Sequence, residues 1–154
     1  MLKGIDPILT PELLMHLCAM GHGEWVAVVD ANFTANQLAA GKPLVRLPGL
    51  SLVRVSQAIL SVFPLDESVA RPVSYMHVCK AAPEHRTPVQ QQLVDLLANA
   101  GVKGGLNGAP AANNVEAVER FAFYDRVRAA SLIVQTGEAT AYGNAMFAKG
   151  VILN

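Results

Sequence analysis

The first part of the chain contains a helical pattern followed directly by a strand pattern. Apolar side chains recur at helical spacing after Thr10-Pro11, where a hydroxyl can cap and a proline suits the first helical position. Gly21 can adopt the left-handed conformation that ends a helix. The run WVAVV at 25–29 is apolar at every position, which is typical of a strand covered on both faces. The pattern predicts a helix of about ten residues, a loop and a buried strand.

Short apolar runs and amphipathic segments alternate along the rest of the chain. Strands are predicted at 44–47, 72–79, 131–136 and 145–153, the last with a glycine break, and helices at 52–63, 87–100 and 121–130. The helix at 87–100 opens with T-P-V-Q, the spacing of a capping box. Because helices alternate with buried strands, the predicted fold class is α/β with a mostly parallel or mixed sheet.

The segment GVKGGLNGAPAANN, residues 101–114, interrupts this alternation. It is rich in Gly, Asn and Ala and has no periodicity, which predicts a loop. A phosphate-binding loop would need G-x-G-x-x-G or a Lys-Ser/Thr pair between a strand and a helix, and the segment has neither. We therefore do not expect a phosphate site here.

Composition narrows the function classes. A length of 154 residues fits one domain. The formal net charge is zero and charged residues make up only 16%, without a Lys/Arg cluster, so nucleic-acid binding is not expected. No stretch approaches the roughly 20 apolar residues that span a bilayer. Apolar residues make up 52%, more than a monomer of this size easily buries, and we therefore expect a homo-oligomer.

The cysteines and the N-terminal segment indicate the cellular compartment in which the protein is expected. Cys18 and Cys79 are far apart in the sequence and lie among apolar residues, which predicts buried free thiols. The N-terminal segment 1–21 is interrupted by prolines and acidic residues, so an export signal is not expected. We expect a reducing cytoplasm.

His22 and Asp30 flank the predicted strand at 25–29. His22 lies between two glycines in a loop, where function is often carried, although a surface histidine without a function has the same pattern. Asp30 follows the strand, where α/β sheets open their binding crevice, or else it caps the next turn. At opposite ends of a straight strand, the two side chains can share a ligand only if the loop folds back or a neighbouring subunit supplies one of them.

A second polar cluster lies in the C-terminal third. RFAFYDR, 120–126, concentrates Arg, Tyr and Asp side chains at a predicted strand-to-helix transition, and TGEATAYGN, 136–144, places Tyr and Asn in a turn. Aromatic rings stack on the apolar faces of sugars, and these polar groups match sugar hydroxyls. The cluster fits a small sugar or polyol, while at least one of its aromatic residues belongs to the core.

The sequence gives little support for a metal site or for catalysis by a nucleophilic serine or cysteine. His16, His77 and His85 give no metal-ligand spacing, and C-x-x-C does not occur. The chain also lacks the G-x-S-x-G turn of a nucleophilic serine. His77, inside the predicted strand 72–79, is expected to be a hydrogen-bonded core or interface residue.

Several segments together resemble one family. The N-terminal MLKGIDPILTPELLMHLCAMGHGEWVAVVDANF, with its G-H-G turn and a strand that ends in Asp-Ala, resembles the start of the fucose mutarotase and ribose pyranase family. RFAFYDR and TGEATAYGN resemble its C-terminal motifs, and FPLDE, 63–67, resembles a further one. RFAFY and the Tyr-Gly-Asn triplet are closer to the fucose branch. The segment 80–115 matches neither branch and is interpreted as a divergent insertion.

The resemblance implies a fold, an assembly and an activity. The fold is a single-domain three-layer α/β sandwich over 1–154, and the assembly is a ring-based decamer with a sugar site between adjacent subunits. No metal or other cofactor is implied. His22 matches the family's catalytic histidine, and Tyr124 matches an acid/base tyrosine. Five further residues match sugar-contacting positions: Asp30, Asp66, Arg120, Tyr142 and Asn144.

The implied activity is the interconversion of the α and β anomers of fucose or a related aldose. Opening and reclosing the ring needs two proton transfers, and an imidazole, with an ordinary pKa of about 6.5, suits them near neutral pH. Three alternatives stay open: a sugar-binding module without catalysis, pyranose–furanose interconversion, and a metal-assisted isomerase that uses His22, Asp30 and His77.

Overall fold

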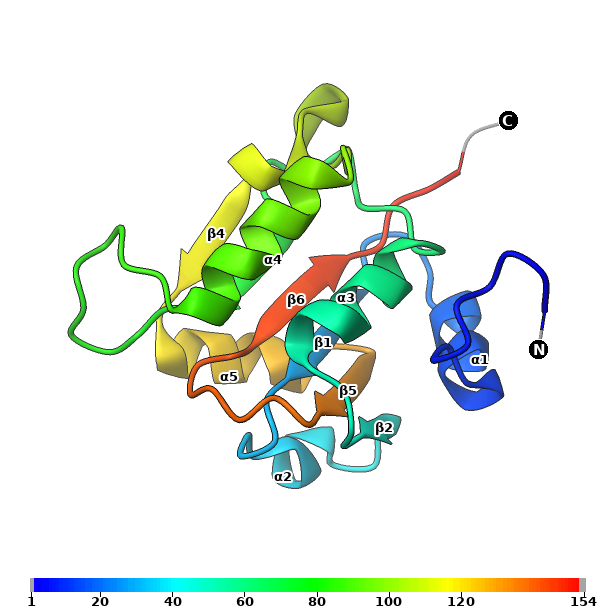
Figure 1. Cartoon of the computed structure of the whole chain (residues 1–154), viewed down its shortest axis with the longest axis horizontal. Helices are drawn as coiled ribbons and strands as arrows, with labels where there is room; N and C mark the ends of the chain where they lie inside the picture. Colours follow the sequence, from blue (N-terminus) through cyan, green and yellow to red (C-terminus); the bar gives the residue numbers. More distant parts are fainter. Residues whose placement is uncertain (1, 153–154) are drawn as a thin grey trace.

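A computed structural model describes residues 2–152 as one mixed six-stranded sheet with helices on both faces (Figure 1). The strands follow the spatial order β2-β5-β1-β6-β3-β4. Their bounds are β1 Trp25–Val29, β2 Leu44–Leu47, β3 Val73–Met76, β4 Val115–Val118, β5 Leu132–Thr136 and β6 Ala145–Ala148. The helices are α1 Pro11–Ala19, α2 Ala35–Ala39, α3 Leu52–Leu60, α4 Pro88–Asn99 and α5 Arg120–Ala129, with short 3-10 turns η1 Leu106–Gly108 and η2 Ala111–Asn113.

Five of the strands run in one direction and β6 runs against them. The pairs β1–β5, β2–β5 and β3–β4 are parallel, whereas β6 lies antiparallel between β1 and β3. The carboxyl ends of β1, β3 and β4 therefore share one edge of the sheet with the start of β6. We call this the carboxyl edge. The predicted α/β fold with a mixed sheet is confirmed.

Alternate side chains of β1 enter two separate hydrophobic cores. Val26 and Val28 belong to the core that also contains buried residues of α1, α3 and α4. Ala27 and Val29 belong to the core formed with α2 and α5. Because both faces of the strand are covered, every position from 26 to 29 is buried, which explains why WVAVV is uniformly apolar. The arrangement has three layers: helices, sheet and helices.

Side-chain caps set the starts of the predicted helices. The Thr10 hydroxyl accepts a hydrogen bond from the Leu13 backbone N–H, and α1 begins with Pro11. At α4, Thr87 and Gln90 form the reciprocal capping box that their spacing predicts. Caps of this kind satisfy backbone donors that a helix leaves free at its first turn. Both predicted helix starts are confirmed.

The segment 80–115, expected to be an insertion, carries α4 and both 3-10 turns. Leu93 and Leu97 of α4 are buried in the same core as α3. The predicted loop over 101–114 contains η1 and η2 but no α-helix or strand. The C-terminal part of the segment enters β4 at Val115. Through α4, the segment thus covers part of one face of the sheet, on the side opposite α5 (Figure 1).

Several local predictions differ from the structure. The strand predicted at 72–79 ends at Met76, because neither neighbour offers a partner beyond that point: β6 begins at Ala145, opposite Tyr75, and β4 ends at Val118, opposite Met76. The left-handed glycine after α1 is Gly23, not Gly21, since α1 ends through an extended Met20. The short elements α2 and β4 were not predicted. A five-residue helix and a four-residue edge strand carry too few positions to show a period.

The last predicted strand, 145–153, is also shorter in the structure. β6 ends at Ala148, and Leu153 lies outside the described residues. Cys18 and Cys79 are free, as predicted, but both are exposed rather than buried. Cys18 lies on the outer side of α1, and Cys79 lies in the loop after β3. Within residues 2–152, every helix is too short or too polar to cross a membrane.

Candidate functional site

A pocket at the carboxyl edge brings together five of the seven predicted site residues. It encloses about 220 Å³, below the roughly 300–1,000 Å³ of sites for drug-sized ligands, so it suits a small molecule. We call it the Asp30 pocket. Its lining comes from the ends of β1 and β3, the first turns of α5 and the loop before β6: Asp30, Asn32, Phe33, Met76, Arg120, Tyr124, Ala141, Tyr142 and Asn144.

Asp30 and Asn144 form a reciprocal buried pair in this pocket. Asn144 Nδ2 donates to Asp30 Oδ2 at 2.8 Å, and the Asp30 backbone N–H donates to Asn144 Oδ1 at 2.9 Å. Asp30 Oδ1 also accepts from the Asn32 backbone N–H, which is the turn contact that its sequence position allowed. Burial raises the pKa of Asp30, and the hydrogen bonds from Asn144 and Asn32 oppose that effect. The pair joins the end of β1 to the loop before β6, and both residues line the pocket.

Arg120 and Tyr124 lie one turn apart at the start of α5. Arg120 Nε donates to the Tyr124 hydroxyl at 3.0 Å, and the guanidinium carbon lies 5.5 Å from the centre of the tyrosine ring. Phe33 packs edge-on against the same ring at 5.5 Å. Arg120 and Phe33 therefore hold the phenol of Tyr124 in position.

Tyr142 enters the pocket from a strained turn. Its backbone has φ +63°, a conformation in which non-glycine residues are uncommon. The neighbouring Cys79 thiol, together with burial, raises the pKa of Tyr142. The pocket thus presents two phenols, one guanidinium and one carboxylate–amide pair around a common space.

The other two predicted residues, His22 and Asp66, meet at the opposite edge of the sheet. His22 Nε2 lies 3.2 Å from Asp66 Oδ1 and 3.3 Å from Ser68 Oγ. The Ser68 hydroxyl and backbone N–H both donate to Asp66 Oδ1, at 2.7 and 2.8 Å. A second pocket surrounds this cluster, and we call it the His22 pocket. Its lining is His22, Leu65, Asp66, Glu67, Ser68 and Val151.

The Asp66 carboxylate determines the hydrogen-bonding role of the His22 nitrogen that faces it. Burial opposes ionisation, but hydrogen bonds from Ser68 and His22 outweigh it and hold the pKa of Asp66 below its ordinary value. An ionised carboxylate only accepts hydrogen bonds, so Nε2 is the nitrogen that donates to it, and in a neutral imidazole Nδ1 then keeps a free lone pair. The Asp66 side chain is 3% exposed and the His22 side chain 50%. The histidine is therefore anchored on one side and open to a ligand on the other.

The two pockets do not meet within one chain. β1 separates them, and its five residues span about 16 Å at about 3.3 Å per residue. His22 precedes the strand and Asp30 follows it, as the sequence predicted for a straight strand. His77 lies just beyond the end of β3, not inside a strand, and its Nε2 meets the Ala82 carbonyl at 2.9 Å.

The metal-ligand set His22, Asp30 and His77 is therefore not assembled. Among residues 2–152, no group of three or more His, Cys, Asp or Glu side chains has a geometry that could hold a metal ion. Asp125, another residue of the RFAFYDR motif, points away from the Asp30 pocket and pairs with Arg128. The metal-assisted alternative thus has no ligand set in the described part of one chain.

The sequence did not single out Ser68, Asn32, Phe33 and Met76. Ser68 follows Asp66 by two residues, the spacing at which a carboxylate accepts from a nearby backbone N–H and hydroxyl, so turn chemistry could have pointed to it. Asn32 has the same spacing to Asp30. Phe33 and Met76 carry no such local signal, because only the pairing of strands and the packing of α5 place them at the pocket.

Comparisons with known proteins agree on one family. The model of the RbsD / FucU transport protein family matches residues 3–152. The chain is 39% identical to the fucose mutarotase of Danio rerio, with 98% of this chain and 94% of the relative covered. It is 38% identical to the L-fucose mutarotase of Glaesserella parasuis serovar 5, with 98% and 96% covered.

Solved structures give the same result. The fucose mutarotase of Streptococcus pneumoniae in complex with L-fucose superposes with a TM-score of 0.86 at 28% identity, covering 99% of this chain and 100% of that one. FucU from Bifidobacterium longum superposes with a TM-score of 0.84 at 34% identity, covering 98% and 100%. A family model over nearly the whole chain and relatives well above 30% identity together are decisive: the chain belongs to the RbsD / FucU transport protein family.

Proposed function

We propose that this protein is a monosaccharide mutarotase, an isomerase that interconverts the α and β anomers of fucose or a closely related aldose. The relatives named above are fucose mutarotases, and this chain matches almost the full length of each. The observation that carries the proposal is the His22–Asp66 pair, in which a buried carboxylate anchors an imidazole with one free nitrogen. An imidazole of this kind can accept and return a proton without a cofactor.

The reaction divides between the two pockets. His22 Nδ1 takes the proton of the anomeric hydroxyl while the Tyr124 phenol gives its proton to the ring oxygen, so the bond between the anomeric carbon and the ring oxygen breaks. The open aldehyde rotates about its first carbon–carbon bond. Tyr124 then recovers a proton from the hydroxyl that attacks the other face, and His22 returns its own to the new anomeric oxygen. Protons balance over the cycle, and the same two groups serve both directions.

The remaining predicted residues divide into two roles. Asp30, Arg120, Tyr142 and Asn144 line the Asp30 pocket and hold sugar hydroxyls, which fixes the ring while it opens. Asp66, also predicted to contact the sugar, lines the His22 pocket, and its carboxylate faces His22. We therefore assign to Asp66 the orientation of His22 in addition to the predicted hydroxyl contact.

The complete site is shared by two subunits in this proposal. Because His22 and Tyr124 lie at opposite edges of one sheet, a single sugar can meet both only if His22 comes from a neighbouring chain. Large exposed apolar side chains accompany each pocket: Phe121, 66% exposed, contacts Tyr124, and Val151, 55% exposed, lines the His22 pocket. Such side chains favour burial between subunits. A ring-based decamer is the proposed assembly, and the free thiols suit the proposed reducing cytoplasm.

Exchange NMR tests the function. Saturation transfer between the α and β signals of L-fucose is measured with substoichiometric protein, and a rate that rises in proportion to protein concentration supports catalysis. Sugar signals that only shift, without faster exchange, would identify a binding module instead. Ribose and galactose in the same experiment separate anomer exchange from pyranose–furanose interconversion and define the substrate. Loss of the rate on adding a chelator would point back to metal-assisted chemistry.

A further inference from the structure

Gln90 is a polar side chain buried completely beneath the Asp30 pocket. It lies in the first turn of α4 and is 0% exposed. Its Oε1 accepts from the Thr87 backbone N–H at 2.9 Å, which is one half of the capping box. Its Nε2 donates twice, to the Met76 carbonyl at 2.7 Å and to the Tyr142 carbonyl at 2.9 Å. The amide thus uses both of its N–H groups away from its own helix.

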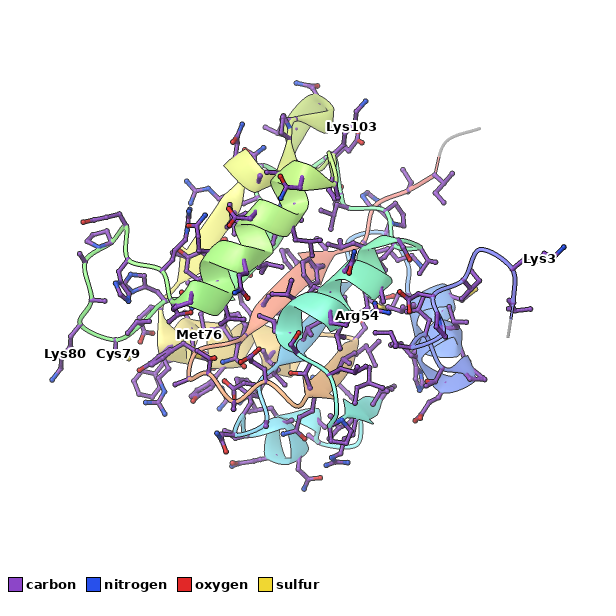
Figure 2. All side chains as sticks on the ribbon, in the orientation of Figure 1. Lys3, Arg54, Met76, Cys79, Lys80 and Lys103 are labelled. Carbon is purple, nitrogen blue, oxygen red and sulfur yellow. The ribbon has the colours of Figure 1, made fainter. Side chains whose placement is uncertain are left out.

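The two carbonyls that Gln90 holds belong to pocket-lining residues. Met76 ends β3 and Tyr142 lies in the loop before β6, and both line the Asp30 pocket. Figure 2 shows Met76 beside the start of α4, and the preceding loop carries the labelled Cys79. One side chain therefore fixes the spacing between two walls of the pocket, the end of β3 and the loop before β6.

The contact with Tyr142 reaches further into the site. The Tyr142 carbonyl also accepts from the Asn144 backbone N–H at 2.9 Å, and the Asn144 amide is paired with Asp30. The strained φ of +63° at Tyr142 needs surrounding contacts to hold it. Gln90 supplies one of them from a helix that is itself anchored in the core through Leu93 and Leu97. Gln90 of α4 is thus linked to the carboxylate of Asp30 through the Tyr142 carbonyl and then through the backbone N–H and side-chain amide of Asn144.

We propose that Gln90 is a positioning residue for the sugar: it holds the Tyr142 turn and the end of β3 at the separation that binds the substrate. It does not contact the sugar and takes no part in proton transfer. The inference rests on the proposed mutarotase function, and it assigns to the segment 80–115 a role in sugar affinity. An amide is required because two N–H donors must face two carbonyls, which neither a carboxylate nor an apolar side chain can provide.

Two variants of Gln90 and two control variants test this role in the full-length protein. Gln90→Met removes both donors and the acceptor at similar size. Gln90→Glu keeps the acceptor for the Thr87 N–H and removes only the donors. Thr87→Ala weakens the same helix start and leaves the Gln90 donors in place. Gln91→Met makes the same change at the neighbouring exposed position, where the Gln91 side chain bonds to the side chains of Arg86 and Asp95. Exchange NMR over a range of fucose concentrations gives kcat and KM, and calorimetry gives the sugar dissociation constant.

We expect both Gln90 variants to raise KM and the dissociation constant about three- to tenfold, with kcat within about twofold of the wild type. Thr87→Ala and Gln91→Met are expected to keep wild-type KM, although Thr87→Ala lowers the melting temperature. A folded Gln90 variant with wild-type KM would overturn the inference, and so would an equal rise of KM in Thr87→Ala. Loss of folding in both Gln90 variants would also overturn it, because the side chain would then serve the fold as a whole. If the wild type shows no exchange, the proposed function fails, and the dissociation constants still test Gln90.

Discussion

His22 Nε2 lies 3.2 Å from Asp66 Oδ1, although 44 residues separate the two in the chain. The contact exists because the end of β6 passes between the segments that carry them: Asp66 N–H donates to the Ala148 carbonyl, and Gly23 N–H donates to the Lys149 carbonyl. A buried carboxylate and a half-exposed imidazole are thus brought together by one strand end. This geometry, rather than the histidine alone, makes position 22 suited to proton transfer.

Replacing the imidazole is expected to remove the proposed proton transfer. We expect His22→Ala to lower the rate of fucose anomer exchange at least tenfold, since a positioned acid/base group contributes about 10²–10⁴-fold. Size-exclusion chromatography is expected to show an unchanged oligomer. His85→Ala, at an exposed loop histidine, is the matched control and should keep the wild-type rate. An unchanged rate in His22→Ala would remove this residue from the mechanism.

Ser68 is expected to affect turnover through His22. Ser68→Ala removes the hydroxyl that donates to Asp66 and lies beside the imidazole, while the backbone N–H bond to Asp66 stays. We expect kcat to fall about three- to tenfold with KM nearly unchanged, because a misaligned imidazole slows proton transfer more than binding. Ser68→Thr keeps the hydroxyl and should recover most of the rate. A change in KM alone would show that Ser68 contacts the sugar instead.

The pKa of Asp66 predicts how stability depends on pH. Since its folded pKa lies below the ordinary value of 3.8, the ionised form stabilises the fold. That contribution is fully present above the unfolded-state pKa and is lost as pH falls through the lower folded value. We expect Asp66→Asn to reduce the free energy of unfolding by about 1–3 kcal/mol at pH 7, and the difference from the wild type to shrink below about pH 4. Urea unfolding at pH 7, 5 and 3 measures it, and a difference that stays constant across this range contradicts the prediction.

A shared site predicts complementation between inactive variants. His22→Ala and Tyr124→Phe each disable a different half of the proposed site, so both homo-oligomers are expected to be nearly inactive. When equal amounts of the two variants are unfolded together and refolded, we expect about a quarter of the wild-type activity. In a random mixture, a quarter of the interfaces combine an intact His22 from one chain with an intact Tyr124 from the other. Mixing without subunit exchange serves as the control. Mixed oligomers with no more activity than their parents would argue that each chain works alone.

Local patterns anticipated much of the fold. The run WVAVV carries the signature of a strand buried on both faces, and the caps at Thr10 and Thr87 each depend on residues within one helical turn. The strand predicted at 72–79 was too long because its end depends on where β4 ends and where β6 begins, about 40 and 70 residues away in the chain. The burial of Cys18 and Cys79 was wrong for a similar reason. Apolar neighbours in sequence do not decide which side of a helix or loop faces solvent.

The candidate site shows the same division. Its residue types and motifs could be recognised from the chain alone, since G-H-G, RFAFY and Y-G-N are contiguous stretches whose chemistry is local. The chain alone could not show how these residues group in space. Asn144 reaches Asp30, 114 residues away in the chain, only because β6 lies antiparallel between β1 and β3. Because β6 runs antiparallel to β1, its start lies at the Asp30 pocket and its end lies at the His22 pocket on the opposite edge. Strand order depends on contacts between distant segments, and no periodicity within a segment encodes it.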